Sequence, residues 1–181
     1  MKKSAKLAAA ALVAGALFIG NNVKAQTAPA NPWRFGIGLE AGAPTGAAHT
    51  ISNFELGGTA RLQYDVNSTF AWTLTSGYYS MIGKEVPGLP GTDYNSLGII
   101  PVKAGIKWFF APSIYFGAEA GAGFETHNGS NTTGSDTKLI LSPTLGWANK
   151  TWDIGARYEN FSGQDNSFGL VGLRIAYGFG L

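Results

Sequence analysis

The chain has 181 residues, 13% of them charged and 13% aromatic, with 26 glycines and no cysteine. Its charged share is far below the roughly 25% of a typical soluble domain, and the lack of cysteine excludes disulfides and thiolate metal sites. Four of the 13 basic residues and none of the 11 acidic ones lie in the first 25 residues, so the remaining nine basic and 11 acidic residues carry a net charge of −2 and form no basic cluster, which excludes nucleic-acid binding.

The N-terminus has the three parts of a secretory signal peptide: a lysine-rich start, a 14-residue apolar run at 7–20 and a small-residue cleavage site. The run is too short for a membrane-spanning helix, which needs roughly 20 apolar residues. We therefore expect a signal peptide at 1–25, cleaved after Ala25. A short periplasmic segment at 26–32 and one barrel domain at 33–181 follow it.

Eight segments then alternate apolar and polar residues with period 2, and each is long enough to cross a bilayer as a tilted strand. They lie at 33–44, 54–64, 70–81, 97–110, 114–124, 138–147, 152–161 and 168–181. A closed barrel is the only structure other than helices that satisfies backbone groups in lipid. The sequence therefore predicts an all-β fold, a transmembrane antiparallel up-and-down barrel of about eight strands. A missed pair in a long connection would give ten.

The connections alternate in length. Those at 65–69, 111–113 and 148–151 are short, and those at 45–53, 82–96, 125–137 and 162–167 are longer. Short periplasmic turns and longer outer loops are typical of such barrels, so we expect both termini in the periplasm of the outer membrane. All five tryptophans fall near the short-turn ends of strands, which predicts a periplasmic aromatic girdle of Trp33, Trp72, Trp108, Trp147 and Trp152.

Most charged residues of the strands share the face opposite the aliphatic side chains. A basic side chain facing lipid at midplane costs about 2 to 4 kcal/mol, so this face must line the lumen. A soluble barrel such as a lipocalin would instead spread its charges over the exterior. An eight-stranded lumen is just wide enough for side chains, so we expect a structural ion-pair network there, with a narrow ion path as the alternative. Its predicted members are Arg34, Glu40, Glu55, Arg61, Lys103, Lys107, Glu119, Glu125, Asp153, Arg157, Glu159 and Arg174.

The last strand carries the most specific motif, Arg174, Ala176, Tyr177, Phe179 and Leu181. It resembles the assembly signal of small outer-membrane β-barrel proteins of the OmpA and OmpX type, although glycine is usual at Ala176 and phenylalanine at Leu181. The resemblance implies a non-enzymatic role in envelope structure, surface interaction or adhesion. It also implies three kinds of partner: outer-membrane lipids including lipopolysaccharide, the barrel-assembly machinery, and an extracellular ligand bound by the outer loops.

A lipid-A-modifying enzyme is the third functional hypothesis, after the narrow porin-like channel. The two histidines, His49 and His127, both fall in long connections. Ser130 and Asp136 follow His127 in a polar segment, but this spacing does not match the catalytic pattern of such enzymes. We expect no catalytic residue, no metal and no cofactor.

Pro101 and Pro143 interrupt two predicted strands, and each removes a backbone N–H from the ladder. The apolar residues also change phase near Pro101, and again between Leu170 and Val171. We therefore expect β-bulges at the two prolines.

Overall fold

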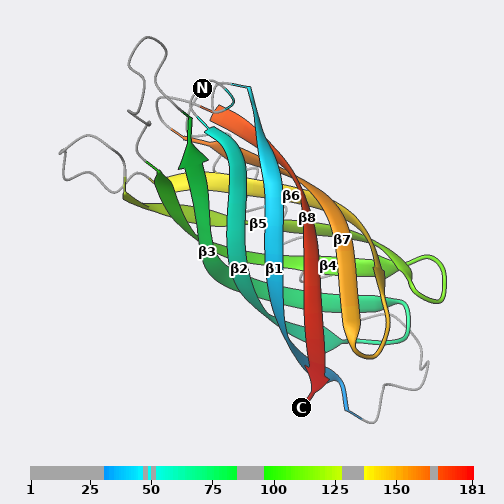
Figure 1. The fold of residues 1–181 in the computed structure, drawn as a ribbon. Helices are drawn as coiled ribbons and strands as arrows, with labels where there is room; N and C mark the ends of the chain where they lie inside the picture. The colour runs from blue at the N-terminus through cyan, green and yellow to red at the C-terminus, as the bar shows by residue number, and fades with distance from the viewer. Residues whose placement is uncertain (1–30, 47–48, 50–51, 85–95, 128–136, 164–166) are drawn as a thin grey trace, which may run out of the picture.

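The computed structural model describes residues 31–46, 49, 52–84, 96–127, 137–163 and 167–181, which form a closed antiparallel barrel (Figure 1). The eight strands are β1 (Trp33–Gly46), β2 (Ser52–Asp65), β3 (Phe70–Gly83), β4 (Leu97–Phe109), β5 (Ile114–His127), β6 (Thr137–Ala148), β7 (Trp152–Ser162) and β8 (Ser167–Gly180). The predicted eight-stranded all-β fold is confirmed. The predicted signal peptide at 1–25 lies outside the described residues. Over the described ranges, no helix is long and apolar enough to cross a membrane.

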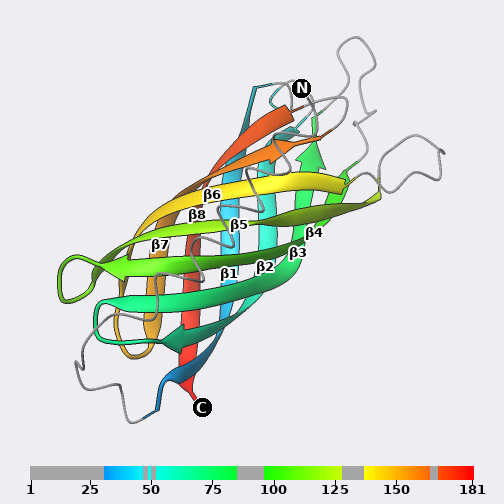
Figure 2. The same ribbon diagram turned by 180° about the vertical axis from the view of Figure 1, so that it is seen from behind.

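Each strand pairs with its neighbours in sequence, and β8 closes the barrel on β1. The view from behind shows β5, β6 and β7 completing the wall (Figure 2). Successive side chains of a strand point to opposite faces of the sheet. The charged residues that alternate with apolar ones therefore lie together on the inner side of the wall. In β1, for example, Glu40 is buried and Leu39 is 74% exposed.

Three connections of three or four residues join β2 to β3, β4 to β5 and β6 to β7 at the end that holds the C-terminus (Figure 1). We call this the turn end and the opposite one the loop end. Two of the turns use the same device. The side-chain oxygen of Asn67 accepts hydrogen bonds from the backbone of Thr69 and Phe70 (2.8 Å each), and that of Asn149 does so from Thr151 and Trp152. Such Asx turns fix a tight reversal without glycine.

Of the four connections at the loop end, those at 47–51, 84–96 and 128–136 are longer than any turn. The connection at 163–166 is as short as the turns, so the predicted alternation in length is weaker there.

The outer surface of the wall is apolar. Leucine, isoleucine and valine side chains that are about half exposed point outward from the strands, among them Ile37, Leu74, Leu145 and Leu173. This arrangement is the reverse of a soluble barrel, and it is the surface expected of a wall that faces hydrocarbon. Aromatic rings gather at the turn end, where Trp33 packs edge-on against Tyr64 and Trp152 does so against Tyr177. Together with Trp72, Trp108 and Trp147, these tryptophans all lie within three residues of the turn end of a strand.

The predicted bulges at the prolines are wrong. At Pro101 the pairing of β4 with β5 is continuous, and the ladder to β3 skips the pairs between Ser76–Val102 and Tyr79–Ile99 without a shift in register. Pro143 behaves in the same way, with continuous pairing to β5 and skipped pairs to β7. The missing N–H thus interrupts one ladder without adding a residue. The register shifts lie elsewhere, near Ser52 and Gly98 at the loop end.

Candidate functional site

The lumen holds a closed ring of alternating charges, which we call the ion-pair ring. In order around the ring, its members are Arg61, Glu119, Lys103, Glu159, Arg157, Glu40, Arg174 and Asp153, the last of which contacts Arg61 again. Lys107 attaches to it through Asp153, and Glu55 through Arg157. Five cations and five anions therefore balance, which is what a dry interior demands of buried charges.

The tightest part of the ring surrounds two carboxylates. Both oxygens of Glu119 lie 3.1 Å from Arg61 Nη2, and one of them is 3.6 Å from Lys103 Nζ. Asp153 Oδ2 lies 2.5 Å from Lys107 Nζ and 3.3 Å from both Arg61 Nη1 and Arg174 Nη1. The rest of the ring is formed by the pairs Lys103–Glu159, Arg157–Glu159 (3.6 Å), Arg157–Glu40 and Arg174–Glu40 (3.3 Å). Each charge thus has at least one opposite partner.

Glu55 has the weakest contacts of the ten charged residues. It is fully buried, yet its nearest cation is Arg157 at 3.8 Å, and its carboxylate oxygens accept no hydrogen bond within the described chain. Glu55 therefore has the same carboxyl group as Glu119 in a much poorer set of contacts.

Hydroxyl groups complete the ring where β3 contributes no charge. Thr75 Oγ1 donates to Glu119 (2.7 Å) and accepts from Arg61, while the Tyr79 hydroxyl accepts from Lys103 and Arg157 at 3.0 Å each. Tyr115 of β5 donates to Asp153. Buried polar groups need such partners, and these hydrogen bonds connect strands across the lumen.

Glycines make room for the two lumen tyrosines. A Cβ at Gly57 would lie 2.5 Å from the Tyr79 ring, and one at Gly146 would lie 2.4 Å from the Tyr115 ring. The lumen glycines thus lie under aromatic rings at these positions, and the rings fill the space that the missing side chains leave.

Toward the loop end, the lumen changes from polar to apolar. A buried apolar cluster fills it there, formed by Tyr79, Met81, Ile99, Ile140, Phe161, Phe168 and Leu170. The rings of Phe161 and Phe168 stack at 4.7 Å. This cluster explains why the apolar residues change from one face of the strand to the other near Pro101 and after Leu170. Ile99 and Leu170 are apolar residues that point into the lumen, and the strands themselves alternate inward and outward without a break there. The sequence analysis did not predict this apolar cluster, and the buried charged residue Glu125 lies beside it, opposite Ile99 in the β4–β5 ladder.

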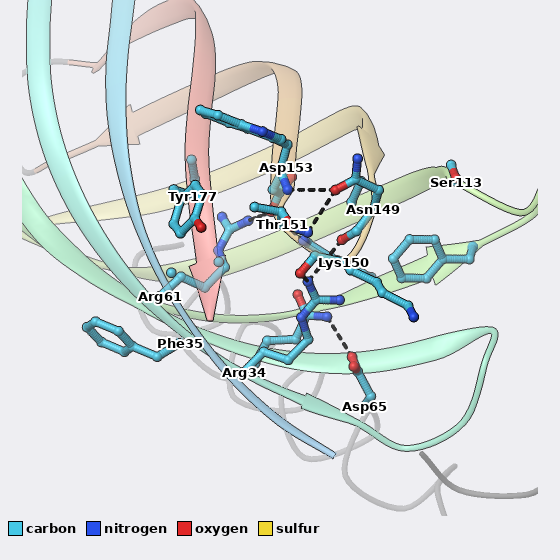
Figure 3. A pocket seen from close by; sticks show the side chains of 18 of the residues that line it. Arg34, Phe35, Arg61, Asp65, Ser113, Asn149, Lys150, Thr151, Asp153 and Tyr177 are labelled. Carbon is cyan, nitrogen blue, oxygen red and sulfur yellow. Dashed lines mark hydrogen bonds and ion pairs between the residues drawn. The ribbon is translucent and has the colours of Figure 1, made fainter. Parts of the chain in front are cut away.

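At the turn end the lumen opens into a cavity of about 540 Å³, which we call the vestibule (Figure 3). Its walls include Arg61, Lys107 and Asp153 from the edge of the ring, and its mouth is bordered by all three short turns. Arg34 lies at this mouth and donates to the backbone carbonyls of Asn149 (2.9 Å) and Lys150. Arg34 was predicted to join the ion-pair network, and the structure places it outside the ring.

Glu125, another predicted network member, pairs with Lys138 of β6 at 3.2 Å. Sequence reasoning missed Lys138, although two-residue steps from Ser142 place it on the inward face of the predicted 138–147 strand. The other ten predicted members are the ring and its two attached groups.

The two histidines lie at the loop end. His49 is exposed and accepts a hydrogen bond at its backbone from Lys84, and His127 pairs with Gly98 in the β4–β5 ladder. Ser130 and Asp136 lie outside the described residues. Within the part of the chain that the structure describes, no cluster of three or more potential metal ligands exists.

Comparison with solved structures identifies the architecture. The attachment invasion locus protein Ail of Yersinia pestis superposes with a TM-score of 0.60 at 18% identity, covering 82% of this chain and 99% of Ail. Ail in complex with the heparin analogue sucrose octasulfate gives 0.58 at 18%, covering 81% and 97%. The N-terminal β-barrel domain of Pseudomonas aeruginosa OprF gives 0.53 at 15%, covering 80% and 97%.

No protein-family model matches the sequence, and no curated protein matches it. At these identities the likeness concerns the fold. The chain has the architecture of the small eight-stranded outer-membrane β-barrels, as the resemblance to the OmpA-like group implied.

Proposed function

We propose that this chain is a non-enzymatic barrel of the outer membrane that serves surface interaction or adhesion through its outer loops. The observation that carries the proposal is the filled lumen. The neutral ion-pair ring and the apolar cluster occupy the barrel from its middle to the loop end. A filled lumen favours a barrel that acts as a scaffold for its loops over a barrel that conducts solutes. The long connections are then the variable surface that such a scaffold displays.

The proposed orientation has short turns and termini in the periplasm. It rests on the usual loop lengths of this barrel class and on the tryptophans at the turn end. Since the chain has no cysteine, single cysteines can report the orientation. We expect a membrane-impermeant maleimide to label Gly88→Cys on intact cells and to leave Lys150→Cys unlabelled. Labelling of Lys150→Cys alone would reverse the orientation.

The outer loops favour a polar ligand of neutral or positive charge. The four connections at the loop end contain one lysine, Lys84, and four acidic residues, Glu85, Asp93, Asp136 and Asp165. Ail has been solved with a heparin analogue, but a sulfated polysaccharide would be repelled by this loop charge. The segment at 128–136 consists largely of Asn, Ser, Thr and Gly, which supply adaptable hydrogen bonds. We therefore propose a carbohydrate or basic protein surface as the extracellular ligand. Lipopolysaccharide and the barrel-assembly machinery are the proposed envelope partners.

Adhesion can be tested with loop replacements. Cells that display the protein should bind immobilised host glycoproteins, and replacing 85–95 or 128–136 by a Gly-Ser linker should reduce this binding. Lys150→Gln changes the opposite end of the barrel and is the matched control. Equal binding by cells without the protein would contradict the proposal, as would equal loss in the control.

A narrow channel is the second candidate, because the vestibule enters the lumen from one end. We expect no single-channel openings from the folded protein in a planar bilayer. Reproducible openings that vanish when the vestibule is altered would make conduction the function.

The enzymatic hypothesis has a separate test. Lipid A mass spectra of cells with and without the protein should be identical. Gain or loss of an acyl chain would overturn the non-enzymatic reading and make His49 and His127 catalytic candidates.

A further inference from the structure

The vestibule at the turn end has the dimensions of a small-molecule site. Its volume of about 540 Å³ falls within the usual range for ligand pockets, roughly 300 to 1,000 Å³. Residues of the β2–β3, β4–β5 and β6–β7 turns all line it, so it opens past the turns (Figure 3). No described residue of the loop-end connections is among those that line it.

The charges that line the vestibule are unequal, although the ring behind it is neutral. Among the residues that the structure describes, five cationic side chains and two carboxylates, those of Asp65 and Asp153, line the vestibule. The cations are Arg34, Arg61, Lys107, Lys150 and Arg174. The remaining carboxylates of the ring and its attached groups do not line the cavity. The network is thus polarised along the barrel axis, with its positive side toward the turn end.

Three of these cations have a charge or an N–H donor that no described residue pairs. The exposed ammonium of Lys150 forms no ion pair with any described residue. Arg34 is held by two backbone carbonyls, which fix its direction but do not neutralise its charge. Arg174 is 4% exposed, and its Nη2 is buried without a hydrogen-bond partner among the described groups. Buried donors of this kind are uncommon in folded proteins. Arg157 Nε and Nη2 are also buried without a hydrogen-bond partner among the described groups, but of these two arginines only Arg174 lines the vestibule.

We propose that the vestibule binds a small ligand that carries two or more carboxylate or phosphate groups. A guanidinium group can donate two parallel hydrogen bonds to two oxygens of a carboxylate or of a phosphate, and such charge-assisted hydrogen bonds are among the strongest available. One anionic group of the ligand lies between Arg34 and Lys150 at the mouth. A second lies deeper, near Arg174 and Lys107. A neutral sugar would leave these charges uncompensated, and a cation would be repelled.

The test uses the full chain after folding into lipid nanodiscs, titrated by calorimetry at low ionic strength, where screening is weakest. Pyrophosphate and citrate are the two probes, and they separate phosphate from carboxylate recognition. We expect saturable binding of at least one probe with a stoichiometry of one. The amide resonances of Asn149 to Trp152 should shift with the same dissociation constant.

Variants at the mouth locate the site. Arg34→Gln with Lys150→Gln should weaken binding about tenfold, since each partly exposed charge contributes a modest share. Lys150→Gln alone should weaken it about threefold, and it disturbs no bond of the turn. Lys84→Gln removes the same charge at the loop end and should leave the dissociation constant unchanged.

The proposal is overturned if neither probe binds saturably, if Lys84→Gln weakens binding as much as Lys150→Gln, or if the mouth variants bind like the wild type. None of these outcomes bears on adhesion by the opposite end.

Discussion

Replacing Glu119 by glutamine tests whether the ion-pair ring holds the barrel together. The substitution keeps the shape of the side chain and removes one of five anions, so the ring and its attached groups acquire a net charge of +1. Breaking a buried ion pair by removing one partner typically destabilises a protein by about 3 to 5 kcal/mol. Here both cations keep another carboxylate: Arg61 lies 3.3 Å from Asp153, and Lys103 contacts Glu159. We therefore expect a loss near the lower limit, about 3 kcal/mol.

Glu55→Gln is the matched control, because it makes the same carboxyl-to-amide change in the same lumen. Glu55 has a single ion pair at 3.8 Å and no hydrogen bond among the described residues. The Glu55→Gln substitution should lower the free energy of unfolding by less than about 1 kcal/mol, since a poorly paired buried carboxyl group contributes little net stability. The comparison shows how much of the effect comes from the contacts of the carboxyl group.

Urea unfolding in lipid vesicles, followed by tryptophan fluorescence, measures both variants. Arg61→Gln should also destabilise the barrel, and the double variant Arg61→Gln with Glu119→Gln should lose less than the sum of the two, by about 1 to 3 kcal/mol. Equal losses for Glu119→Gln and Glu55→Gln would refute the reasoning, because the loss would then not depend on the contacts that Glu119 makes. Strict additivity in the double variant would refute a direct contact.

Three further variants probe the rest of the structure by the same unfolding assay. Tyr79→Phe removes the hydroxyl that accepts from two cations and should destabilise by about 1 to 3 kcal/mol, whereas an unchanged midpoint would show that the cations need no such acceptor. Leu39→Arg places a charge on the most exposed aliphatic position of β1 and should lower stability in lipid by about 2 to 4 kcal/mol, with Leu39→Ala as control; equal effects would mean that this face does not meet hydrocarbon. Asn149→Ala removes two side-chain-to-backbone bonds of a turn and should lower stability by about 1 kcal/mol, while retention of full stability would show that the turn forms without them.

The alternation of apolar and polar residues was enough to predict the eight-stranded barrel from the sequence alone. Period 2 is a local property of the strand, so the inward direction of Glu40 or Arg174 follows from any correct strand boundary. The cost of charge in lipid then decided which face is the lumen, and ten of the twelve predicted network residues meet in the ring and its attached groups.

Only the tertiary structure decided which charges pair. Pairing across the lumen depends on the stagger of eight strands around the closed wall, and no single strand encodes that stagger. It brings Asp153 to Arg61, Lys107 and Arg174 on three strands, and it leaves Arg34 among the carbonyls of a turn. The sequence could not predict the apolar cluster for the same reason. In the sequence, Ile99 and Leu170 appear to break the alternation of apolar and polar residues. Only the fold shows that they point inward and pack there against apolar side chains of other strands.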